Sequence, residues 1–207
     1  MEGFLLPLVI HPRVRKTIGR VAAMTCVAVF ASAGAAYAAC PAQTTTTPFA
    51  QWGDHSSYFL VPGGSFEGTE SQVGWNLDNA ELTAGNEPFY VHDKSDDQSL
   101  TIDGGGTATS PVFCADATMP DFRFFAREDS PGGDLKVEGV IQTPYGPYTA
   151  TVATIADGSM PSWAPTAQLK IPSIPTGWRI PVSLRFVVSG GGSWQVDDVY
   201  VDPYRAG

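Results

Sequence analysis

Acidic side chains occur at two places in the chain where the surrounding residues favour burial. Glu67 lies in VPGGSFEGTESQVGW, directly after Phe66, and the pair Asp197 and Asp198 interrupts the β-forming stretch SWQVDDVYV. On an extended strand the two aspartates point to opposite faces, so one of them is expected to face the core. A buried carboxylate is costly unless a partner supplies compensating charge. These positions therefore raise the question of what balances their charge.

A divalent cation is the simplest partner for inward-facing carboxylates in a chain with 12 Lys+Arg against 21 Asp+Glu. Calcium fits this role because it accepts carboxylate and backbone carbonyl oxygens in a flexible geometry. Two alternatives stay open for Glu67. It is an ordinary surface glutamate, or it forms a buried ion pair with Arg123 or Arg127 in DFRFFARE.

The sequence lacks the motifs of common catalytic chemistry. It contains no G-x-S-x-G, no H-E-x-x-H, no Walker loop and no G-x-G-x-x-G. His55 in GDHSS and His92 in VHDKSDD are interpreted as surface loop residues. Adjacent carboxylates such as Asp96-Asp97 point to opposite faces of a strand and make poor acid–base couples for glycoside hydrolysis. We therefore expect a protein that is not an enzyme, with a polysaccharide lyase or hydrolase as the alternative.

The first 39 residues have the pattern of a secretory signal peptide. A basic region containing Arg13 and Arg20 precedes the apolar stretch 21–36, and Ala36-Tyr37-Ala38 is an A-x-A cleavage signal. The apolar stretch is too short for a good membrane span. We expect cleavage after Ala38 or Ala39 and secretion of the mature chain, with lipidation at Cys40 as an alternative.

The mature chain is acidic and has two cysteines. Removing the leader takes away four basic residues and one acidic residue, which leaves a net charge of about −12. This charge argues against partners that require a basic face, namely nucleic acid and anionic membrane surfaces. Cys26 leaves with the leader, so Cys40 and Cys114 are expected to form one disulfide outside the cell. Two free thiols or a metal pair are the alternatives.

About a dozen short β-rich segments follow one another, separated by Gly, Pro, Asp and Asn. They read SYFLV, SFE, GWNL, AELT, PFYVH, SLTI, SPVFC, DFRFFAR, LKVEGVIQT, YTATVATI, AQLKI, IPVSLRFVVS and SWQVDDVYV. Apolar and polar residues alternate in 135–142 and 182–189, as expected for a sheet with one buried face. The pattern predicts an all-β fold, an antiparallel sandwich or barrel. We expect a strap at 40–56, including PAQTTTTP and Cys40, and a single domain at 57–207.

Three short motifs resemble those of galactose-binding-like jelly rolls. G-x-F-E-G followed by G-W, then S-L-x-I, and finally W-Q-V-D-D-V are similar to carbohydrate-binding modules of the CBM 4/9 and CBM 22 type. The pattern from 57 to 202 also looks like a set of uncharacterised secreted bacterial proteins, and the strap is not part of the carbohydrate-binding pattern. The resemblance implies a jelly-roll β-sandwich with a structural calcium where the first and last strands meet. The implied ligands are the side chains of Glu67 and Asp197, with Asp198 next to it, and backbone carbonyls near Ser65 and Gln98.

Aromatic residues provide candidate ligand contacts, because sugar rings stack on aromatic faces while polar groups bind their hydroxyls. The candidates are Trp163 in MPSWAP, Trp178 in PTGWR, Tyr145 and Tyr148 in TPYGPY, and Trp75, for which a place in the core is the alternative. Together these patterns predict a secreted monomer that binds a polysaccharide or cell-envelope glycan without catalysis. A structural or adhesive extracellular protein without glycan binding is the alternative.

Overall fold

Alternation of apolar and polar residues produces the long strands at the centre of the fold. A computed structural model of the chain describes residues 42–119, 121–143, 145–171 and 174–203. In the strand Gly133–Thr143, Leu135 and Val137 are fully buried, and the alternate residues Asp134, Lys136 and Glu138 are partly exposed. Its neighbour Arg179–Gly190 pairs with it so that Phe186 lies opposite Val137. The predicted period of two is therefore confirmed in the two segments where it is clearest.

The described residues contain eleven strands and two short helical turns, joined by loops. The turns are η1 (Ala50–Trp52) and α1 (Glu70–Val73). The strands are β1 (Phe59–Leu60), β2 (Asn76–Ala84), β3 (Gln98–Thr109), β4 (Phe113–Asp116), β5 (Asp121–Ser130), β6 (Gly133–Thr143), β7 (Gly146–Ile155), β8 (Ala164–Pro165), β9 (Leu169–Lys170), β10 (Arg179–Gly190) and β11 (Ser193–Val201).

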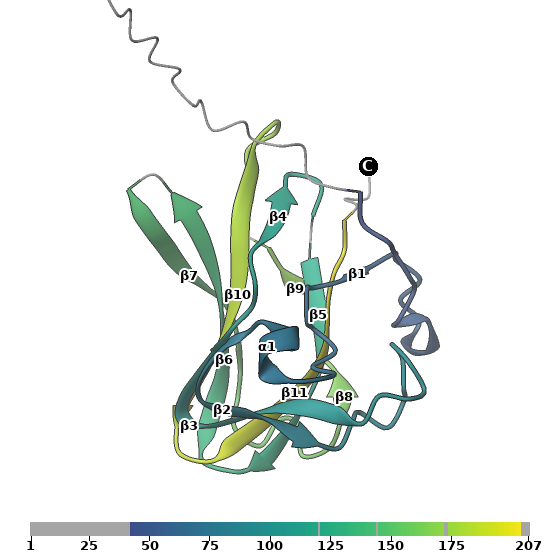
Figure 1. Cartoon of the computed structure of the whole chain (residues 1–207), viewed down its shortest axis with the longest axis vertical. Coiled ribbons are helices and arrows are strands. Elements are labelled where there is room, and N and C mark those ends of the chain that lie inside the picture. Colours follow the sequence, from purple (N-terminus) through teal and green to yellow (C-terminus); the bar gives the residue numbers. More distant parts are fainter. Residues whose placement is uncertain (1–41, 120, 144, 172–173, 204–207) are drawn as a thin grey trace, which may run out of the picture. The chain divides into compact units, whose positions relative to one another are not determined.

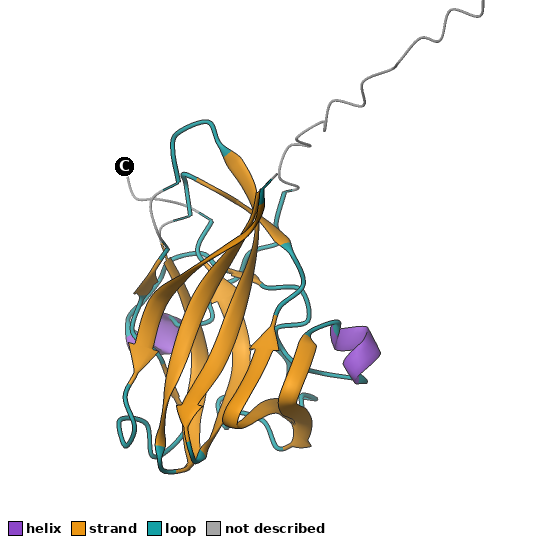
Figure 2. Ribbon diagram, turned by 90° about the vertical axis from the view of Figure 1, so that its left-hand side faces the viewer, coloured by secondary structure: helices purple, strands orange, loops and turns teal. Residues whose placement is uncertain are grey.

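All strand pairs are antiparallel, and the sheet curls on itself into a β-sandwich. The order along the main path is β7-β6-β10-β3-β11-β5-β8. β1 pairs with β11, β2 with β3, β4 with β10, and β9 with β5. Figure 1 shows the curl, and Figure 2 shows how strands dominate the structure. The predicted all-β, antiparallel sandwich is confirmed.

The apolar residues form two separate clusters. The main core lies between the sheet layers and is fully buried at its centre, as shown by Leu100, Ile102, Phe122, Phe124, Phe186, Trp194 and Val196. A second, smaller cluster contains Phe49, Tyr58, Phe125 and Tyr200. Phe49 comes from the strap, and its ring stacks on that of Phe125 at 5.5 Å. The strap is therefore packed against β5 and β11, and it lies beside them in Figure 1.

Some predicted strands are not strands in the structure. SFE belongs to a turn in which Phe66 has a positive φ of 57°. PFYVH is also irregular, because the backbone N–H groups of Phe89 and Val91 donate to the carboxylate of Glu87 rather than to a neighbouring strand. GWNL and AELT contribute to a single strand, β2, which is interrupted by a bulge at Asn79.

Several predictions concern residues outside the described part of the chain. The signal peptide, its cleavage site and Cys40 all lie there. Cys114 lies on β4. Its pairing with Cys40 remains a prediction. Within the described ranges, neither helical turn has the length and apolar character needed to cross a membrane.

Candidate functional site

The strand β11 buries both of its adjacent aspartates. Asp197 is 0% exposed and Asp198 is 1% exposed, so the expectation that only one of them faces inward is wrong. The reason is a break in the strand: Asp198 has a positive φ of 49°, and the pairing with β5 shifts register between Asp197 and Tyr200. A bulge of this kind redirects a side chain and ends the simple alternation of faces. Both carboxylates consequently lie inside the protein.

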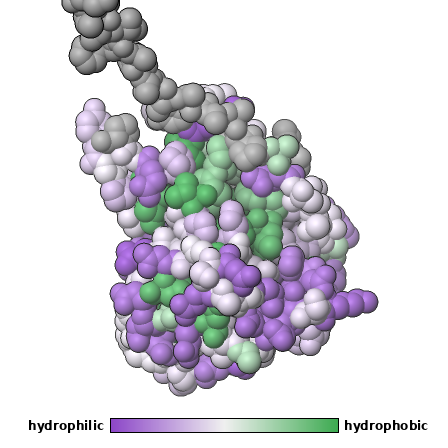
Figure 3. Space-filling model, viewed as in Figure 1, coloured by the Kyte–Doolittle hydropathy of each residue, from purple (hydrophilic) through white to green (hydrophobic). Residues whose placement is uncertain are grey.

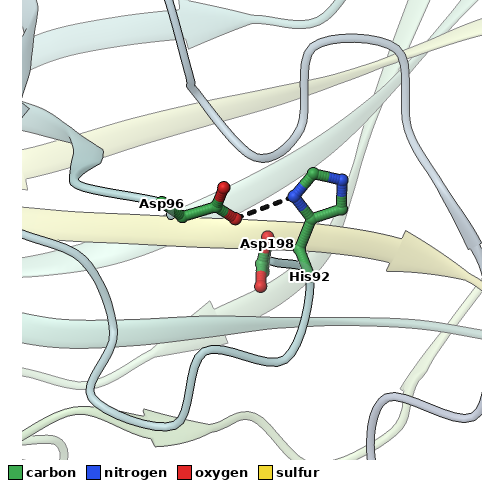
Figure 4. Close-up of side chains that lie close together, drawn as sticks. All are labelled: His92, Asp96 and Asp198. Carbon is green, nitrogen blue, oxygen red and sulfur yellow. Dashed lines mark hydrogen bonds and ion pairs between the residues drawn. The ribbon is translucent and has the colours of Figure 1, made fainter. Parts of the chain in front are cut away.

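Among the described residues, Asp198 has no hydrogen-bond partner at close range, although the nearby backbone N–H of His92 opposes the rise of its pKa. Both of its side-chain oxygens are buried, and neither has a hydrogen-bond partner among the described residues. Ligand atoms of Asp198, Asp96 and His92 lie within 4.8 Å of one another (Figure 4). Nδ1 of His92 is 2.7 Å from Oδ2 of Asp96. A buried polar group left unpaired is costly, so this arrangement is suited to an additional positively charged partner.

Two more buried carboxylates surround this group, Glu87 and Asp197. Oδ2 of Asp197 accepts from the backbone N–H of Glu87 at 3.0 Å, and Oδ1 accepts from that of Asp198 at 2.9 Å. Glu87 is 0% exposed and accepts from the N–H groups that follow it. We term Glu87, Asp96, Asp197 and Asp198 the acid cluster. Glu87, Asp96 and Asp197 accept hydrogen bonds from backbone N–H groups, whereas neither oxygen of Asp198 has a close hydrogen-bond partner among the described residues.

Burial and mutual repulsion govern the protonation of the acid cluster. Burial, followed by the charges of Glu87 and Asp96, raises the pKa of Asp198 to about 8. Burial and the charge of Asp198 raise the pKa of Asp197 well above its usual range. Burial also raises the pKa of Glu87. These shifts all have the direction expected for carboxylates placed together away from water and from cations.

The donor set of the acid cluster fits a hard divalent cation. Asp96 and Asp198 offer carboxylate oxygens, which calcium prefers. His92, whose side chain is 37% exposed, hydrogen-bonds Asp96 and can orient that carboxylate. A histidine nitrogen is also a ligand for zinc and other transition metals, so direct coordination by His92 would favour such a metal over calcium.

The predicted calcium ligands lie at or near this cluster. Oε1 of Glu67 accepts from the backbone N–H groups of Asp97 and Gln98, each at 2.9 Å. The charge of Glu67 also contributes to the raised pKa of Asp198. Oε1 of Gln98 accepts from the N–H of Gly68, and Ser65 is a buried residue of the preceding turn. Glu67 thus fixes the start of β3 next to the acid cluster.

The alternative of an ion pair between Glu67 and an arginine is wrong. Arg123 pairs with Asp54 at 2.8 Å, and Arg127 pairs with Asp129 at 3.0 Å. The residues that sequence reasoning missed are Glu87, Asp96 and His92. His92 was expected to be a plain surface residue. The spacing of His92 and Asp96 in VHDKSDD was the available signal, but it is also typical of ordinary loops.

A second group of charged residues connects the strap to the sandwich, and each of its carboxylates forms an ion pair with a basic side chain of the same group. Oδ2 of Asp54 accepts from Nη1 of Arg123 at 2.8 Å and from the hydroxyl of Tyr58 at 2.7 Å. Asp121 pairs with Lys170 at 3.0 Å. We term Asp54, Tyr58, Asp121, Arg123 and Lys170 the strap network. Burial by itself raises the pKa of Asp54, but hydrogen bonds from Tyr58, Arg123 and Ser56 outweigh it and lower that pKa to about 2.

A hollow of about 650 Å³ opens beside the strap network. It is lined by residues 52–56 of the strap together with Arg123 and Gln168, and we term it the strap hollow. Nε2 of Gln168 donates to Oδ2 of Asp54 at 3.3 Å. His55, an exposed residue as expected, lies on its wall.

The predicted aromatic ligand contacts are distributed over different parts of the molecule. Trp75 is 5% exposed and packs on Phe66 and Phe186, so it belongs to the core and offers no face to a ligand. Trp163 is half-buried, with the guanidinium of Arg127 5.7 Å from its ring centroid. Of the predicted aromatic contacts, three are exposed: Tyr145 (100%), Tyr148 (60%) and Trp178 (62%).

Tyr148 borders an apolar pocket of about 120 Å³ between β4, β6, β7 and β10. Its lining is aliphatic and aromatic, as in Ile141, Val152 and Ile180. Hydrophobic residues gather in the upper half of the face shown in Figure 3, whereas hydrophilic residues cover most of the lower half. Because its lining is apolar, the pocket beside Tyr148 lacks the polar groups that would bind sugar hydroxyls.

Comparison with known proteins identifies the fold. No protein-family model and no curated protein matches the sequence. The structure is similar to the tandem CBM22-1-CBM22-2 domain of Xyn10C from Paenibacillus barcinonensis, with a TM-score of 0.50 and 14% identity over 81% of this chain and 49% of that chain. The xylan-binding CBM22-1 domain of the same protein has a TM-score of 0.46, with 14% identity, and the match covers 70% of this chain and 94% of that one.

The CBM22-1–GH10 modules of Xyn10B from Clostridium thermocellum, complexed with xylohexaose, have a TM-score of 0.48 and 14% identity. That match covers 67% of this chain and 27% of that chain. At these identities the likeness concerns the fold alone, and it rests on the tandem domain. The jelly-roll β-sandwich of the carbohydrate-binding modules is thus the architecture of this chain.

Proposed function

We propose that the chain is a secreted, non-catalytic carbohydrate-binding β-sandwich whose fold is stabilised by calcium in the acid cluster. The observation that carries the calcium assignment is Asp198, a buried carboxylate with no hydrogen-bond partner among the described residues. Asp96 and Asp198 would hold the ion, with Glu67 at the edge of the site. Bound calcium would supply the positive charge that these carboxylates otherwise lack.

The carbohydrate-binding role is supported by the fold and by the surface. The jelly-roll likeness to a CBM22 tandem domain makes a glycan the first ligand class to test, although a fold by itself does not determine function. Aromatic rings, which can accept sugar rings, reach the surface of the described residues in several places. The signal-peptide pattern of the first 39 residues supports secretion.

Two observations support a non-catalytic role. Asp54, the carboxylate in the strap hollow, has a pKa of about 2 and accepts hydrogen bonds from Arg123 and Tyr58, which makes it a poor general base. The acid cluster is buried, so its aspartates are not placed to meet a polymeric substrate.

Metal binding is tested by calorimetric titration of EDTA-treated protein with Ca²⁺, Mn²⁺ and Zn²⁺. Calcium is expected to bind at one site, and Asp198→Asn is expected to remove that binding. Asp54→Asn is the matched control, because it changes a carboxylate of the strap network and should leave calcium affinity unchanged. Preference for Zn²⁺ together with loss of affinity in His92→Gln would replace calcium by a histidine-ligated metal.

Carbohydrate binding is tested by retention of the protein on insoluble xylan, cellulose and bacterial cell-wall fractions in calcium buffer. Retention on at least one of these materials, competed by the soluble form of the same glycan, is the expected result. Failure on every glycan would refute carbohydrate binding while leaving the metal site untouched.

A structural or adhesive role is the second candidate, and the exposed apolar side chains favour it. Val112 is 54% exposed and Trp178 62%, and the apolar pocket beside Tyr148 is not suited to sugar hydroxyls. In that case the protein would be retained on hydrophobic surfaces or on copies of itself, and soluble glycans would not compete.

A further inference from the structure

We propose that the strap hollow is the saccharide-binding site of this protein. This inference rests on the proposed carbohydrate-binding function and assigns it a place. The hollow is built by residues 52–56, which belong to the strap, and by Arg123 and Gln168 of the sandwich. The hollow is a wide, open depression, a shape that can admit part of a polymeric chain.

The floor of the hollow is a rigid, planar polar group. Nε and Nη2 of Arg123 donate to the carbonyl oxygen of Thr166 at 2.8 and 2.6 Å, and Nη1 donates to Asp54. The guanidinium lies over the ring of Phe49, 4.3 Å from its centroid. An arginine has five N–H donors, and three of them are used in these contacts. The side chain is held in place before any ligand arrives.

Polar atoms of several kinds surround this floor. Gln168 uses its Nε2 toward Asp54, and its Oε1 has no hydrogen bond to any described residue. Ser56 contributes a hydroxyl and His55 an exposed imidazole. Both donors and acceptors therefore line the hollow, and a sugar hydroxyl can bind either kind because it both donates and accepts.

The lining of the hollow includes the ring of Trp52, which is held in place by contacts with other aromatic rings. Trp52 is half-buried and packs edge-on against Phe89, with centroids 4.9 Å apart. Its ring also lies 5.3 Å from that of Phe125. Phe89 itself is 38% exposed. A tryptophan that borders a polar hollow offers an apolar face to the C–H groups of a sugar ring.

The charges of the hollow favour a neutral saccharide. Asp54 and Arg123 already neutralise each other at 2.8 Å, so a charged ligand would find no unpaired partner between them. The chain as a whole carries a net charge of −9, which disfavours anionic glycans. A neutral sugar avoids both penalties and still meets the polar side chains of the hollow.

The strap hollow has both aromatic and polar lining residues, whereas the lining of the pocket beside Tyr148 is apolar. That pocket has an exposed aromatic ring at its border and an aliphatic lining. In the strap hollow, the aromatic ring of Trp52 and the polar side chains line the same space. Affinity and specificity for a sugar require the two together.

The test measures retention on insoluble xylan, cellulose and bacterial cell walls, followed by titration with xylohexaose, cellohexaose or β-1,4-galactotriose. Trp52→Ala and Gln168→Ala are the hollow variants, and Trp178→Ala is the control for an exposed aromatic outside it. Because Trp52 packs on the rings of Phe49, Phe89 and Phe125, the folding of its variant is checked by thermal melting. Gln168 is exposed, so Gln168→Ala keeps the test valid if Trp52→Ala does not fold.

We expect Trp52→Ala to weaken saccharide binding about ten-fold or more, equivalent to about 1.4 kcal/mol, and Gln168→Ala to weaken it several-fold. Trp178→Ala should bind like the unmodified protein. Unchanged binding in both hollow variants, with binding lost in Trp178→Ala, would overturn the placement of the site and leave carbohydrate binding intact. If the unmodified protein binds none of the glycans, both the placement and the proposed function fail.

Discussion

The acid cluster and the strap network both hold buried carboxylates, but only the second contains its own cations. In the strap network, Asp54 meets Arg123 and Asp121 meets Lys170. In the acid cluster, Asp96, Asp197, Asp198 and Glu87 lie together, with His92 as their one basic neighbour in the described residues. The carboxylates of the strap network are thus paired with basic side chains, whereas those of the acid cluster lie next to one another.

The pKa values express this difference. The pKa of Asp54 is lowered to about 2, because hydrogen bonds from Tyr58, Arg123 and Ser56 outweigh its burial. The pKa of Asp198 is raised to about 8, because burial and the charges of Glu87 and Asp96 act in the same direction. The ion pair of Asp54 and Arg123 stabilises the charged carboxylate from within the protein, whereas in our proposal the acid cluster is stabilised in its charged form by a bound cation.

Removal of Arg123 should have the largest effect on stability. Arg123→Ala leaves Asp54 without its cation and the carbonyl of Thr166 without its donors. Breaking a fully buried pair costs about 3–5 kcal/mol, and this pair, whose side chains are 9% and 12% exposed, should cost about 3 kcal/mol. Urea denaturation measures the loss, and Arg127→Ala is the matched control. The side chain of Arg127 is 37% exposed, and its loss should cost about 1 kcal/mol or less. Equal losses in both variants would contradict the assignment of Asp54–Arg123 as a buried pair.

Asp198→Asn should raise the stability of the protein in metal-free buffer and lower it in calcium buffer. In EDTA the variant should be more stable than the unmodified protein, because it removes a buried carboxylate whose pKa is about 8. In calcium at about 100 times the dissociation constant it should be less stable, because it forgoes about 2.7 kcal/mol of binding energy. Denaturation curves in the two buffers measure both differences. A variant that is less stable in both buffers would indicate that Asp198 is held by protein contacts.

Acid should remove the contribution of Asp54. Its folded pKa of about 2 lies below the ordinary value of 3.8, so the stabilisation is present above about pH 4 and is lost as the pH falls through 2. The advantage of the unmodified protein over Asp54→Asn should therefore shrink by about 2 kcal/mol between pH 5 and pH 2. Urea denaturation at a series of pH values gives this difference. An advantage that does not change over this range would show that Asp54 is not paired as described.

Lys170→Ala should have the smallest effect. The side chain of Lys170 is 71% exposed, although that of Asp121 is only 4% exposed. An ion pair with one partner in water contributes about 1 kcal/mol or less and is weakened by salt. Thermal melts at low and high salt should show a small loss that disappears at high salt. A loss of more than about 2 kcal/mol at both salt concentrations would place Lys170 among the buried pairs.

The fold could be predicted from the sequence because its signals are local. Alternation in 135–142 and 182–189 predicts strands directly, and both are strands in the structure. Local reasoning failed at PFYVH, whose composition favours a strand, because a tertiary factor decides its conformation: Glu87 binds the backbone N–H groups of Phe89 and Val91.

The candidate site was predicted in part. The sequence pointed to Glu67, Asp197 and Asp198 as one neighbourhood, and the structure brings them together around β11 and the start of β3. It could not indicate which aspartate lacks a close hydrogen-bond partner among the described residues, because that depends on the bulge at Asp198. The strap network joins Asp54 to Arg123 across 69 residues, a separation at which no local pattern reports a contact.

The measurement that tests the central claim most directly is the melting temperature of the unmodified protein in calcium and in EDTA. If calcium balances the acid cluster, the midpoint should be higher in calcium by about 5–10 °C, the equivalent of about 2.7 kcal/mol in a domain of this size. Equal midpoints in the two buffers would contradict the claim, because the buried carboxylates would then be stable without an external cation.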